Sequence, residues 1–252
     1  MAQDTHTDSQ MSTMKKTLIL TTTLLMSSLN LQAAPLDDLQ KQEVRELVRK
    51  TLVENPDILV EAMNELRKQE VVAQQNADQK MLKSRHKDLF ENPENPVIGN
   101  PKAKLTIAYF GDYNCGYCKR QDPVLKKIVE QNPDVKIVIK ELPILGPESR
   151  EAAEMALATF KQDKSKYLTV NQRLMSKPGR HSSGSIKAAL KAEGINSDKL
   201  KVDESVSRQI NDNLRLAQDL GIRGTPALVF PDEVLRGYTE EAALKEMIKK
   251  RL

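Results

Sequence analysis

The sequence predicts an α/β protein that carries a helical extension ahead of its first strand. The run KLTIAYF at residues 104–110 is rich in β-branched and aromatic side chains, and VKIVIKEL at residues 135–142 alternates apolar and polar side chains. Between them, residues 122–131 place apolar side chains at helical spacing. A strand, a helix and a second strand in this order form a βαβ unit, and helical patterns dominate both the preceding segment and residues 148–220.

The composition argues against nucleic-acid binding. The chain has 252 residues, a length that suits one large domain or one domain with an appendage. Its formal net charge is +4, and lysine and arginine are dispersed among aspartate and glutamate. Because a nucleic-acid-binding surface needs clustered cations, we expect no nucleic-acid partner.

The N-terminal residues have the pattern of a secretory signal. Lys15 and Lys16 precede an apolar run at residues 17–31, and the small residues Ala33 and Ala34 follow. A basic start, a short apolar stretch and small residues at its end predict export and cleavage after one of these alanines. An uncleaved membrane anchor is the alternative, and it fits less well because the run is short and rich in threonine and serine.

Residues 1–13 do not fit this signal, because they include two aspartates but no lysine or arginine. Met14 directly precedes the two lysines, so translation begins either at Met1 or at Met14. We assign residues 1–34 to a leader and signal peptide. No second apolar segment of this kind follows, and we expect a soluble protein in a bacterial periplasm.

Residues 35–90 form a predicted helical segment with little core of its own. Two apolar stripes at helical spacing flank the sequence ENPD, with Val44, Leu47, Val48 and Leu52 before it and Leu59, Met63 and Leu66 after it. Residues 67–86 are almost wholly polar, so we expect a linker helix there. Stripes this small are marginal alone. We therefore expect a homo-oligomer, a dimer or a trimer, formed through residues 36–66; packing against the chain's own body is the alternative.

Proline, asparagine and glycine at residues 91–101 mark the boundary to a second domain, which we place at residues 97–252. This domain holds the βαβ unit, then a helical insertion at about residues 147–220. The apolar run GIRGTPALVF follows, contains Pro226 and predicts a strand. A final amphipathic helix is expected in TEEAALKEMIKKRL.

Cys115 and Cys118 are the only cysteines, and they stand between the first strand and the helix of the βαβ unit. A disulfide that closes so small a loop removes little entropy from the unfolded chain, so a structural role explains the pair poorly. Their position predicts a thioredoxin-type redox motif. The N–H groups and dipole at a helix start stabilise a thiolate. We therefore expect Cys115 to be the exposed nucleophile and the more buried Cys118 to resolve the mixed disulfide.

A metal site is the main alternative use of the two thiols. A structural zinc site needs four ligands, and the chain adds only His6, His86 and His181 to the cysteines. His6 lies in the predicted leader, and the other two lie in the polar helix and in a loop. We therefore expect no metal and no cofactor.

The segment FGDYNCGYC at residues 110–118, the helical insertion and a late Thr-Pro pair together resemble the DsbA-like thiol-disulfide oxidoreductases. The resemblance covers residues 97–252 and implies a thioredoxin fold interrupted by a helical domain. It also implies that Pro226, preceded by Thr225, has a cis peptide bond and lies against the cysteine pair. An ordinary edge-strand proline is the alternative. The segment LVENPDILVEAM is similar to the oligomerisation segments of ScsC-like and Com-type proteins.

Gly116 and Tyr117, the residues between the cysteines, bear on the direction of the reaction. By the same resemblance, strong oxidants carry Pro-His at these positions. Gly-Tyr with Thr225 before the proline instead resembles the DsbC-type isomerases. Lys119 and Arg120 would favour oxidation by lowering the pKa of the first thiol, although a solvated helix face is their simpler role.

Resolution of a mixed disulfide requires a proton acceptor for the buried Cys118 thiol. Asp112 and Glu141 are the candidate proton carriers. Glu141 is the better candidate because it lies at the end of the second strand of the βαβ unit.

Together these features predict an exported thiol-disulfide oxidoreductase that favours isomerisation and also oxidises. Its expected partners are unfolded or misfolded exported proteins and a membrane redox partner that resets the cysteines. Assembly of several catalytic domains would let one copy hold a substrate while another attacks it. The alternatives are a DsbA-type dithiol oxidase and, less favoured, a non-enzymatic chaperone or a Cu(I)-binding protein that uses the thiolate pair.

Overall fold

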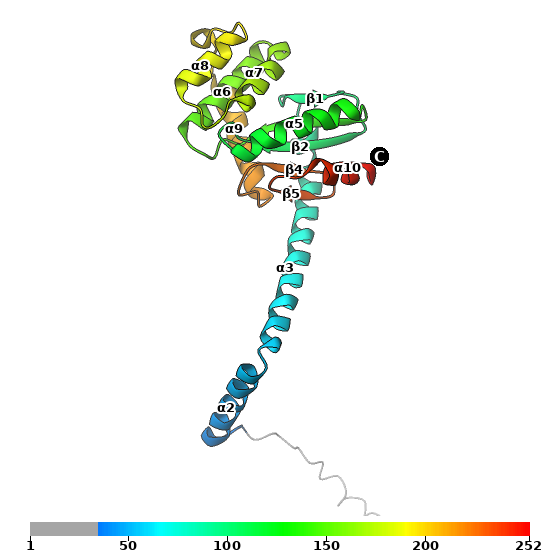
Figure 1. Cartoon of the computed structure of the whole chain (residues 1–252), viewed down its shortest axis with the longest axis vertical. Helices are drawn as coiled ribbons and strands as arrows, with labels where there is room; N and C mark the ends of the chain where they lie inside the picture. Colours follow the sequence, from blue (N-terminus) through cyan, green and yellow to red (C-terminus); the bar gives the residue numbers. More distant parts are fainter. Residues whose placement is uncertain (1–34) are drawn as a thin grey trace, which may run out of the picture. The chain divides into compact units, whose positions relative to one another are not determined.

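The computed structural model describes residues 35–252, so the predicted signal peptide and the choice between Met1 and Met14 lie outside the described residues. The chain divides into two units, one that ends at Glu65 and one at residues 66–252 (Figure 1). Within residues 35–252, no helix combines the length and the apolarity that a membrane span requires.

The smaller unit is built from α2 (Asp38–Glu54) and the first turns of α3 (Asp57–Ser84). Asp37 and Gln40 form a capping box at the start of α2, and the backbone N–H of Asn55 closes its end. α2 buries none of its side chains, so contacts within the described chain do not account for its apolar stripe.

The larger unit is organised around a five-stranded sheet of order β1-β3-β2-β4-β5. Its strands are β1 (Val97–Gly99), β2 (Leu105–Gly111), β3 (Val135–Glu141), β4 (Ala227–Val229) and β5 (Val234–Arg236). β2 and β3 run parallel, and the other pairs are antiparallel. The expected βαβ unit is confirmed, whereas the strand expected in GIRGTPALVF is only three residues long.

Helices make up most of the remaining chain. α5 (Gly116–Gln131) connects β2 to β3 and begins earlier than its apolar pattern indicates, directly after Cys115. Between β3 and β4 the chain forms α6 (Pro147–Gln162), α7 (Lys164–Ser176), α8 (Ser183–Ala192), a short 3-10 helix (Ser197–Lys199) and α9 (Glu204–Asp219). Two helices flank the sheet in sequence, α4 (His86–Phe90) before β1 and α10 (Glu241–Lys249) after β5.

The two faces of the sheet carry different cores, because successive side chains of a strand point to opposite faces. One face holds Ile107 and Tyr109 and packs against α5, α6, α7, α8 and α10. The other face holds Ala108 and Phe110 and packs against α4, α9 and the end of α3, where Leu82 is buried. The last turns of α3 therefore belong to the larger unit.

An ion pair adds a polar anchor to this end of α3. Asp78 accepts two hydrogen bonds from the Arg236 guanidinium of β5, at 2.8 and 3.0 Å, and a third from Gln74 at 2.8 Å. Arg236 also donates to the Leu220 carbonyl at 2.6 Å. Bidentate pairing of this kind fixes orientation as well as distance. It ties the C-terminal part of α3 to the edge strand β5 of the sheet.

Candidate active site

Cys115 occupies the N-cap of α5, directly after the turn that follows β2. Its Sγ accepts a hydrogen bond from the backbone N–H of Cys118 at 3.4 Å. Cys118 lies one turn inside the helix and is fully buried, whereas Gly116 and Tyr117 between the two thiols are exposed. The helix start therefore places the two sulfurs in unequal surroundings.

β4 begins directly after Thr225 and Pro226 and holds Thr225 against Cys115. It pairs antiparallel with β2, with Ala227 opposite Phe110. The Thr225–Pro226 peptide bond is cis, and Cys115 Sγ lies 3.2 Å from the Thr225 carbonyl oxygen, to which its protonated form donates. Cys115 is only 7% exposed, less than the open position that the sequence led us to expect, because this segment lies against its sulfur.

Hydrogen bonding lowers the pKa of Cys115 from an ordinary 9.0 to about 6. The largest cause is the hydrogen bond from the Cys118 side chain; burial opposes it, and the Thr225 side chain and two backbone N–H groups add to it. Burial acts on Cys118 in the other direction and raises its pKa far above the usual range of a thiol. At neutral pH Cys115 is therefore mostly a thiolate and Cys118 a thiol, and only a thiolate attacks disulfides.

Lys119 and Arg120 make other contacts. Lys119 Nζ donates to two backbone carbonyls of the loop after α7, and the Arg120 guanidinium lies over the rings of Tyr117 and Tyr238. The groups that most lower the pKa of Cys115 are hydrogen-bond donors to its sulfur. Lys119 still interacts with the first thiol, because the charge of Cys115 raises the pKa of Lys119 against the larger effect of burial.

Glu141 lies at the end of β3 in a buried cluster. Its Oε1 accepts hydrogen bonds from the hydroxyls of Tyr113 at 2.7 Å and Tyr167 at 2.8 Å, and the Tyr113 hydroxyl also lies 3.0 Å from Asn171 Oδ1. Burial raises the pKa of Glu141 to about 7, so this carboxyl exchanges a proton near neutral pH. In the described chain its side-chain hydrogen bonds go to tyrosines rather than to Cys118. A proton from that thiol therefore needs an intermediary.

Asp112, the other candidate proton carrier, shapes the loop that carries Cys115. Its Oδ1 accepts from the backbone N–H of Asn114 at 2.7 Å. Its Oδ2 accepts from the N–H groups of Ile144 and Leu145 at 2.9 and 3.0 Å. Both oxygens of this buried carboxyl thus bind backbone groups of the two segments that follow β2 and β3.

Tyr109 is a functional candidate that the sequence patterns do not single out. It is 2% exposed, and its hydroxyl makes no ordinary hydrogen bond to another described side chain or backbone group. The Cys118 thiol lies beside it, and burial, followed by the charge of that sulfur, raises the pKa of Tyr109. Gly111 makes room for the ring, since a Cβ there would lie 2.7 Å from Tyr109 Cε1. A glycine on the same strand face, just before a cysteine pair, is the signal that could have indicated this residue.

His181 belongs to the scaffold of the site. Its backbone N–H donates to Asn114 Oδ1 at 2.6 Å, and its ring nitrogens lie 2.9 Å from the Leu174 carbonyl and 3.1 Å from Ser185 Oγ. His86 lies apart, in α4. Among residues 35–252, no group of three or more histidine, cysteine, aspartate or glutamate side chains is placed to hold a metal ion.

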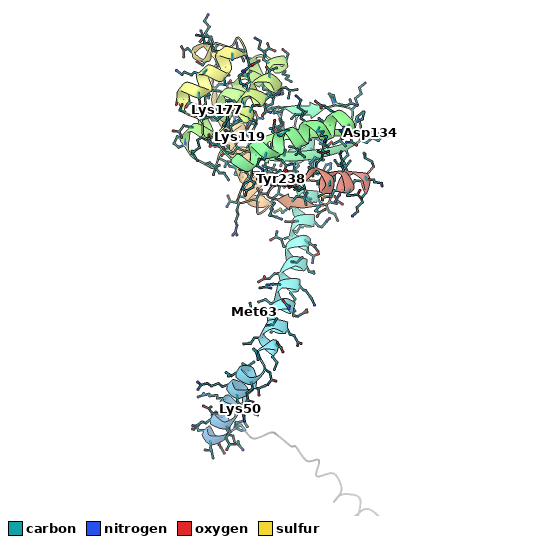
Figure 2. All side chains as sticks on the ribbon, in the orientation of Figure 1. Lys50, Met63, Lys119, Asp134, Lys177 and Tyr238 are labelled. Atoms are coloured by element: carbon teal, nitrogen blue, oxygen red, sulfur yellow. The ribbon has the colours of Figure 1, made fainter. Side chains whose placement is uncertain are left out.

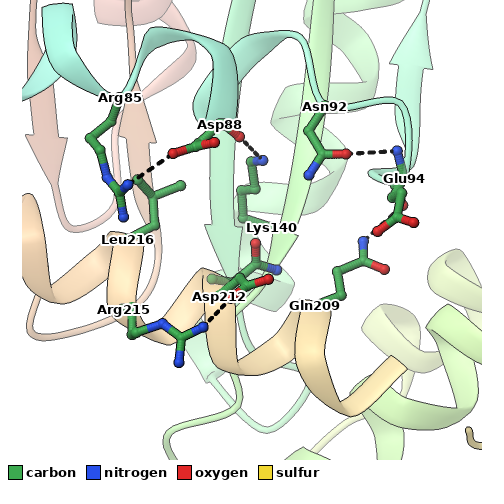
Figure 3. Close-up of a pocket in the computed structure, with 10 residues that line it drawn as sticks. Arg85, Asp88, Asn92, Glu94, Lys140, Gln209, Asp212, Arg215 and Leu216 are labelled. Carbon is green, nitrogen blue, oxygen red and sulfur yellow. Dashed lines mark hydrogen bonds and ion pairs between the residues drawn. The ribbon is translucent and has the colours of Figure 1, made fainter. Parts of the chain in front are cut away.

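A polar pocket of about 330 Å³ lies on the face of the sheet that is opposite to the cysteines (Figure 3). Lys140 enters it from β3, is 1% exposed and donates to the Asp88 carbonyl. Arg85 pairs with the Asp88 carboxylate at 3.0 Å. Burial lowers the pKa of Lys140 to about 8. Because neighbouring residues of a strand point to opposite faces, this pocket faces away from Glu141 and the cysteines.

Known domain families account for most of the described chain. Residues 106–249, more than half of the chain, match the DSBA-like thioredoxin domain, and residues 40–71 match the copper resistance protein ScsC N-terminal domain. The expected thioredoxin fold with an inserted helical domain and a preceding helical segment is thereby confirmed.

Individual relatives agree with these matches. A linker-deletion mutant of Proteus mirabilis ScsC is 39% identical, has a TM-score of 0.68, and the similarity covers 87% of this chain and 98% of that chain. A periplasmic thioredoxin-like protein from Salmonella enterica serovar Typhimurium is 39% identical, with a TM-score of 0.63 and coverage of 66% and 94%. Disulfide bond formation protein D of Bacillus subtilis (strain 168) is 26% identical over 170 residues, which are 62% of this chain and 77% of that protein.

Proposed function

Since this chain belongs to the DsbA-like thioredoxin family and is a thiol-disulfide oxidoreductase of the DsbA and ScsC type, we propose that it reshuffles disulfides of exported proteins. One observation carries the exchange chemistry, the unequal pair formed by the Cys115 thiolate at the N-cap of α5 and the buried, protonated Cys118. Gly116 and Tyr117 favour isomerisation over net oxidation through their resemblance to the DsbC-type isomerases. We place the reaction in the periplasm because of the N-terminal signal pattern and the periplasmic relative from Salmonella.

In isomerisation, the Cys115 thiolate attacks one sulfur of a substrate disulfide, a mixed disulfide forms, and the other substrate sulfur leaves as a thiolate. That thiolate attacks a second disulfide of the same substrate. A substrate thiolate then displaces Cys115, which leaves as a thiolate, so no electrons are gained or lost. If rearrangement stalls, Cys118 loses its proton and attacks Cys115 Sγ. The substrate leaves reduced, and the membrane redox partner must then reduce the enzyme disulfide.

Net oxidation is a second candidate, and the lowered pKa of Cys115 favours it. A stabilised thiolate makes the reduced enzyme more stable and its disulfide a better oxidant. A substrate thiolate would attack Cys115 Sγ, and Cys118 would leave and take up a proton. A second substrate thiolate would then displace Cys115. The substrate loses two electrons, the enzyme gains them, and the membrane redox partner must accept them.

We further assign self-association, as a dimer or a trimer, to residues 36–66. Most apolar side chains of this segment are between 42% and 73% exposed, and Leu52 is partly buried. The exposed ones include Leu39, Val44, Leu47, Val48, Val53, Ile58, Leu59, Val60, Met63 and Leu66. Burial of such a stripe against another copy removes apolar surface from water. The match of residues 40–71 to the ScsC N-terminal domain supports this assignment. Two or more catalytic units on one assembly raise the effective concentration of thiolate at a held substrate.

The test compares residues 35–252 with residues 66–252 in the reactivation of ribonuclease with scrambled disulfides, at matched active-site concentration. The shorter chain keeps Leu82, Leu89 and Phe90, which are buried in the larger unit, so a cut closer to β1 would damage the core.

We expect residues 35–252 to reactivate the scrambled ribonuclease. We expect residues 66–252 only to oxidise reduced ribonuclease. Oxidation without reactivation by both chains would refute isomerisation and leave net oxidation. Cys115→Ala should abolish both activities, and retained activity would refute the role of this thiolate.

A further inference from the structure

A groove of about 660 Å³ runs between α5 and the end of α7, and its lining begins at Lys119, the residue after Cys118. Two carboxylates line the groove, and they face a larger number of cations. The five cationic side chains of the lining are Lys119, Arg120, Lys126, Lys127 and Lys177. Figure 2 marks Lys119 and Lys177, which come from the two different walls of the groove. The lining is therefore strongly basic, although the chain as a whole is only mildly so.

Most of this charge is held in place without being neutralised. In the described chain Lys127 pairs with Glu241 at 2.8 Å. Lys119 and Lys177 donate instead to backbone carbonyls of residues 177–180. Carbonyl dipoles orient an ammonium group but leave its charge. Burial and then the charge of Lys177 lower the pKa of Lys119, and the charges of Asp112 and Cys115 oppose this in part. The ammonium groups of Lys119 and Lys177 therefore repel each other. A bound anion would relieve that repulsion.

The two carboxylates offset the charge only in part. Asp122 lies toward the core, where its Oδ1 is 3.5 Å from Asn171 Nδ2. The positive charge of Lys126 stabilises its carboxylate. Glu130 lies ~16 Å from Lys119 along the helix axis. At the end of the groove nearest the cysteines, Lys119, Arg120 and Lys177 therefore outnumber Asp122, the one lining carboxylate near them.

We propose that this groove binds an acidic segment of the polypeptide whose disulfide reacts with Cys115, an inference that rests on the proposed function. Lys119 directly follows Cys118 in α5, and Lys126 lies ~16 Å from Cys115 along the helix axis. An extended peptide covers that length with about five residues. The acidic residues belong within about five positions of the reacting cysteine of the substrate.

The test uses reduced residues 35–252 and synthetic peptides whose single cysteine carries a thionitrobenzoate disulfide. Three peptides share their length and cysteine position and carry aspartate, serine or lysine at the flanking positions. The Cys115 thiolate attacks the peptide sulfur, and thionitrobenzoate leaves as a coloured thiolate, so its release gives the rate. Each rate is divided by that of dithiothreitol with the same peptide, which removes the peptide's intrinsic reactivity.

Two double variants distinguish the effect of the groove on the rates from the effect of the protein's net charge. Lys126→Glu with Lys177→Glu reverses two cations of the groove. Lys199→Glu with Lys201→Glu makes the same change of net charge at two exposed positions outside it. The wild-type rates are also measured at rising salt, which tests the groove without any substitution.

The aspartate peptide should react about tenfold faster than the lysine peptide at low salt, and the ratio should approach one as salt screens the groove. The groove variant should lose the ratio, and the control variant should keep it. Three results would refute binding of an acidic segment in the groove while the proposed function stands. These are equal rates for the aspartate and lysine peptides, a rate ratio that does not depend on salt, or an equal loss of this ratio in the groove and control variants. Failure of the wild type to react with the serine peptide would instead refute the proposed function.

Discussion

Replacement of Cys118 by alanine tests whether the neighbouring thiol is what makes Cys115 acidic. The Cys118 side chain is the largest of the causes that lower the pKa of Cys115 from 9.0 to about 6. A hydrogen bond to a charged group contributes about 1.5–3 kcal/mol, which corresponds to about one to two pKa units. Because the backbone N–H at 3.4 Å remains in Cys118→Ala, we expect a Cys115 pKa between about 7 and about 8.

The assay is the rate of iodoacetamide alkylation as a function of pH, since only the thiolate is alkylated. Cys118→Ser is the matched control, because its hydroxyl can still donate a hydrogen bond to the Cys115 sulfur. We expect the serine variant to keep a pKa closer to that of the wild type than the alanine variant does. An unchanged pKa in Cys118→Ala would refute this account and assign the shift to the backbone N–H groups at the helix start.

Stability should depend on pH through the same thiol. Its folded pKa is lowered from 9.0 to about 6, so the stabilisation by the thiolate is complete above the unfolded value and is lost as pH falls through about 6. After a discount for screening by solvent near the helix start, this amounts to about 2 kcal/mol. The Tm of the reduced wild type should exceed that of Cys115→Ala by less as pH falls from about 9 to about 5.5; a constant difference would contradict this prediction. Leu82→Ala should lower the free energy of unfolding in urea by about 2–5 kcal/mol, because Leu82 is 1% exposed. Leu59→Ala, at a side chain 49% exposed, should leave that transition unchanged and weaken self-association in analytical ultracentrifugation; equal destabilisation by both would contradict the division into two units. Gly111→Ala should cost about 1–3 kcal/mol by crowding the Tyr109 ring. A second substitution, Tyr109→Ala, should make the added methyl group nearly neutral, and a cost independent of Tyr109 would show that the crowding lies elsewhere.

The features that the sequence predicts well are those with local causes. Apolar and alternating patterns at residues 104–110 and 135–142 place β2 and β3 within about one residue of their observed bounds. The position of Cys115 at a helix start follows from its place between a strand pattern and a helix pattern. These elements depend on neighbours in sequence, so a pattern is sufficient to find them.

Other features depend on segments that meet only in the folded chain. Lys140 occupies a polar position of an alternating strand, which predicts exposure to water, yet it is buried because α4 and α9 cover that face. Leu82 lies in a mostly polar stretch, and its burial depends on the path of α3. Glu141 meets Tyr113 and Tyr167, which come from separate elements. No pattern within one segment contains these partners.

The placement of the tyrosines has a consequence for spectroscopy. The chain has five tyrosines and no tryptophan. Tyr109, Tyr113 and Tyr167 share a buried core with the cysteine pair. Tyr117 stands between the two cysteines in sequence, and its ring lies 6.5 Å from that of Tyr238. The intrinsic ultraviolet emission of the protein therefore originates around its catalytic centre, and the thiolate is a quencher within reach. Oxidation of the cysteines, or capture of a peptide, becomes an optical signal that requires no label.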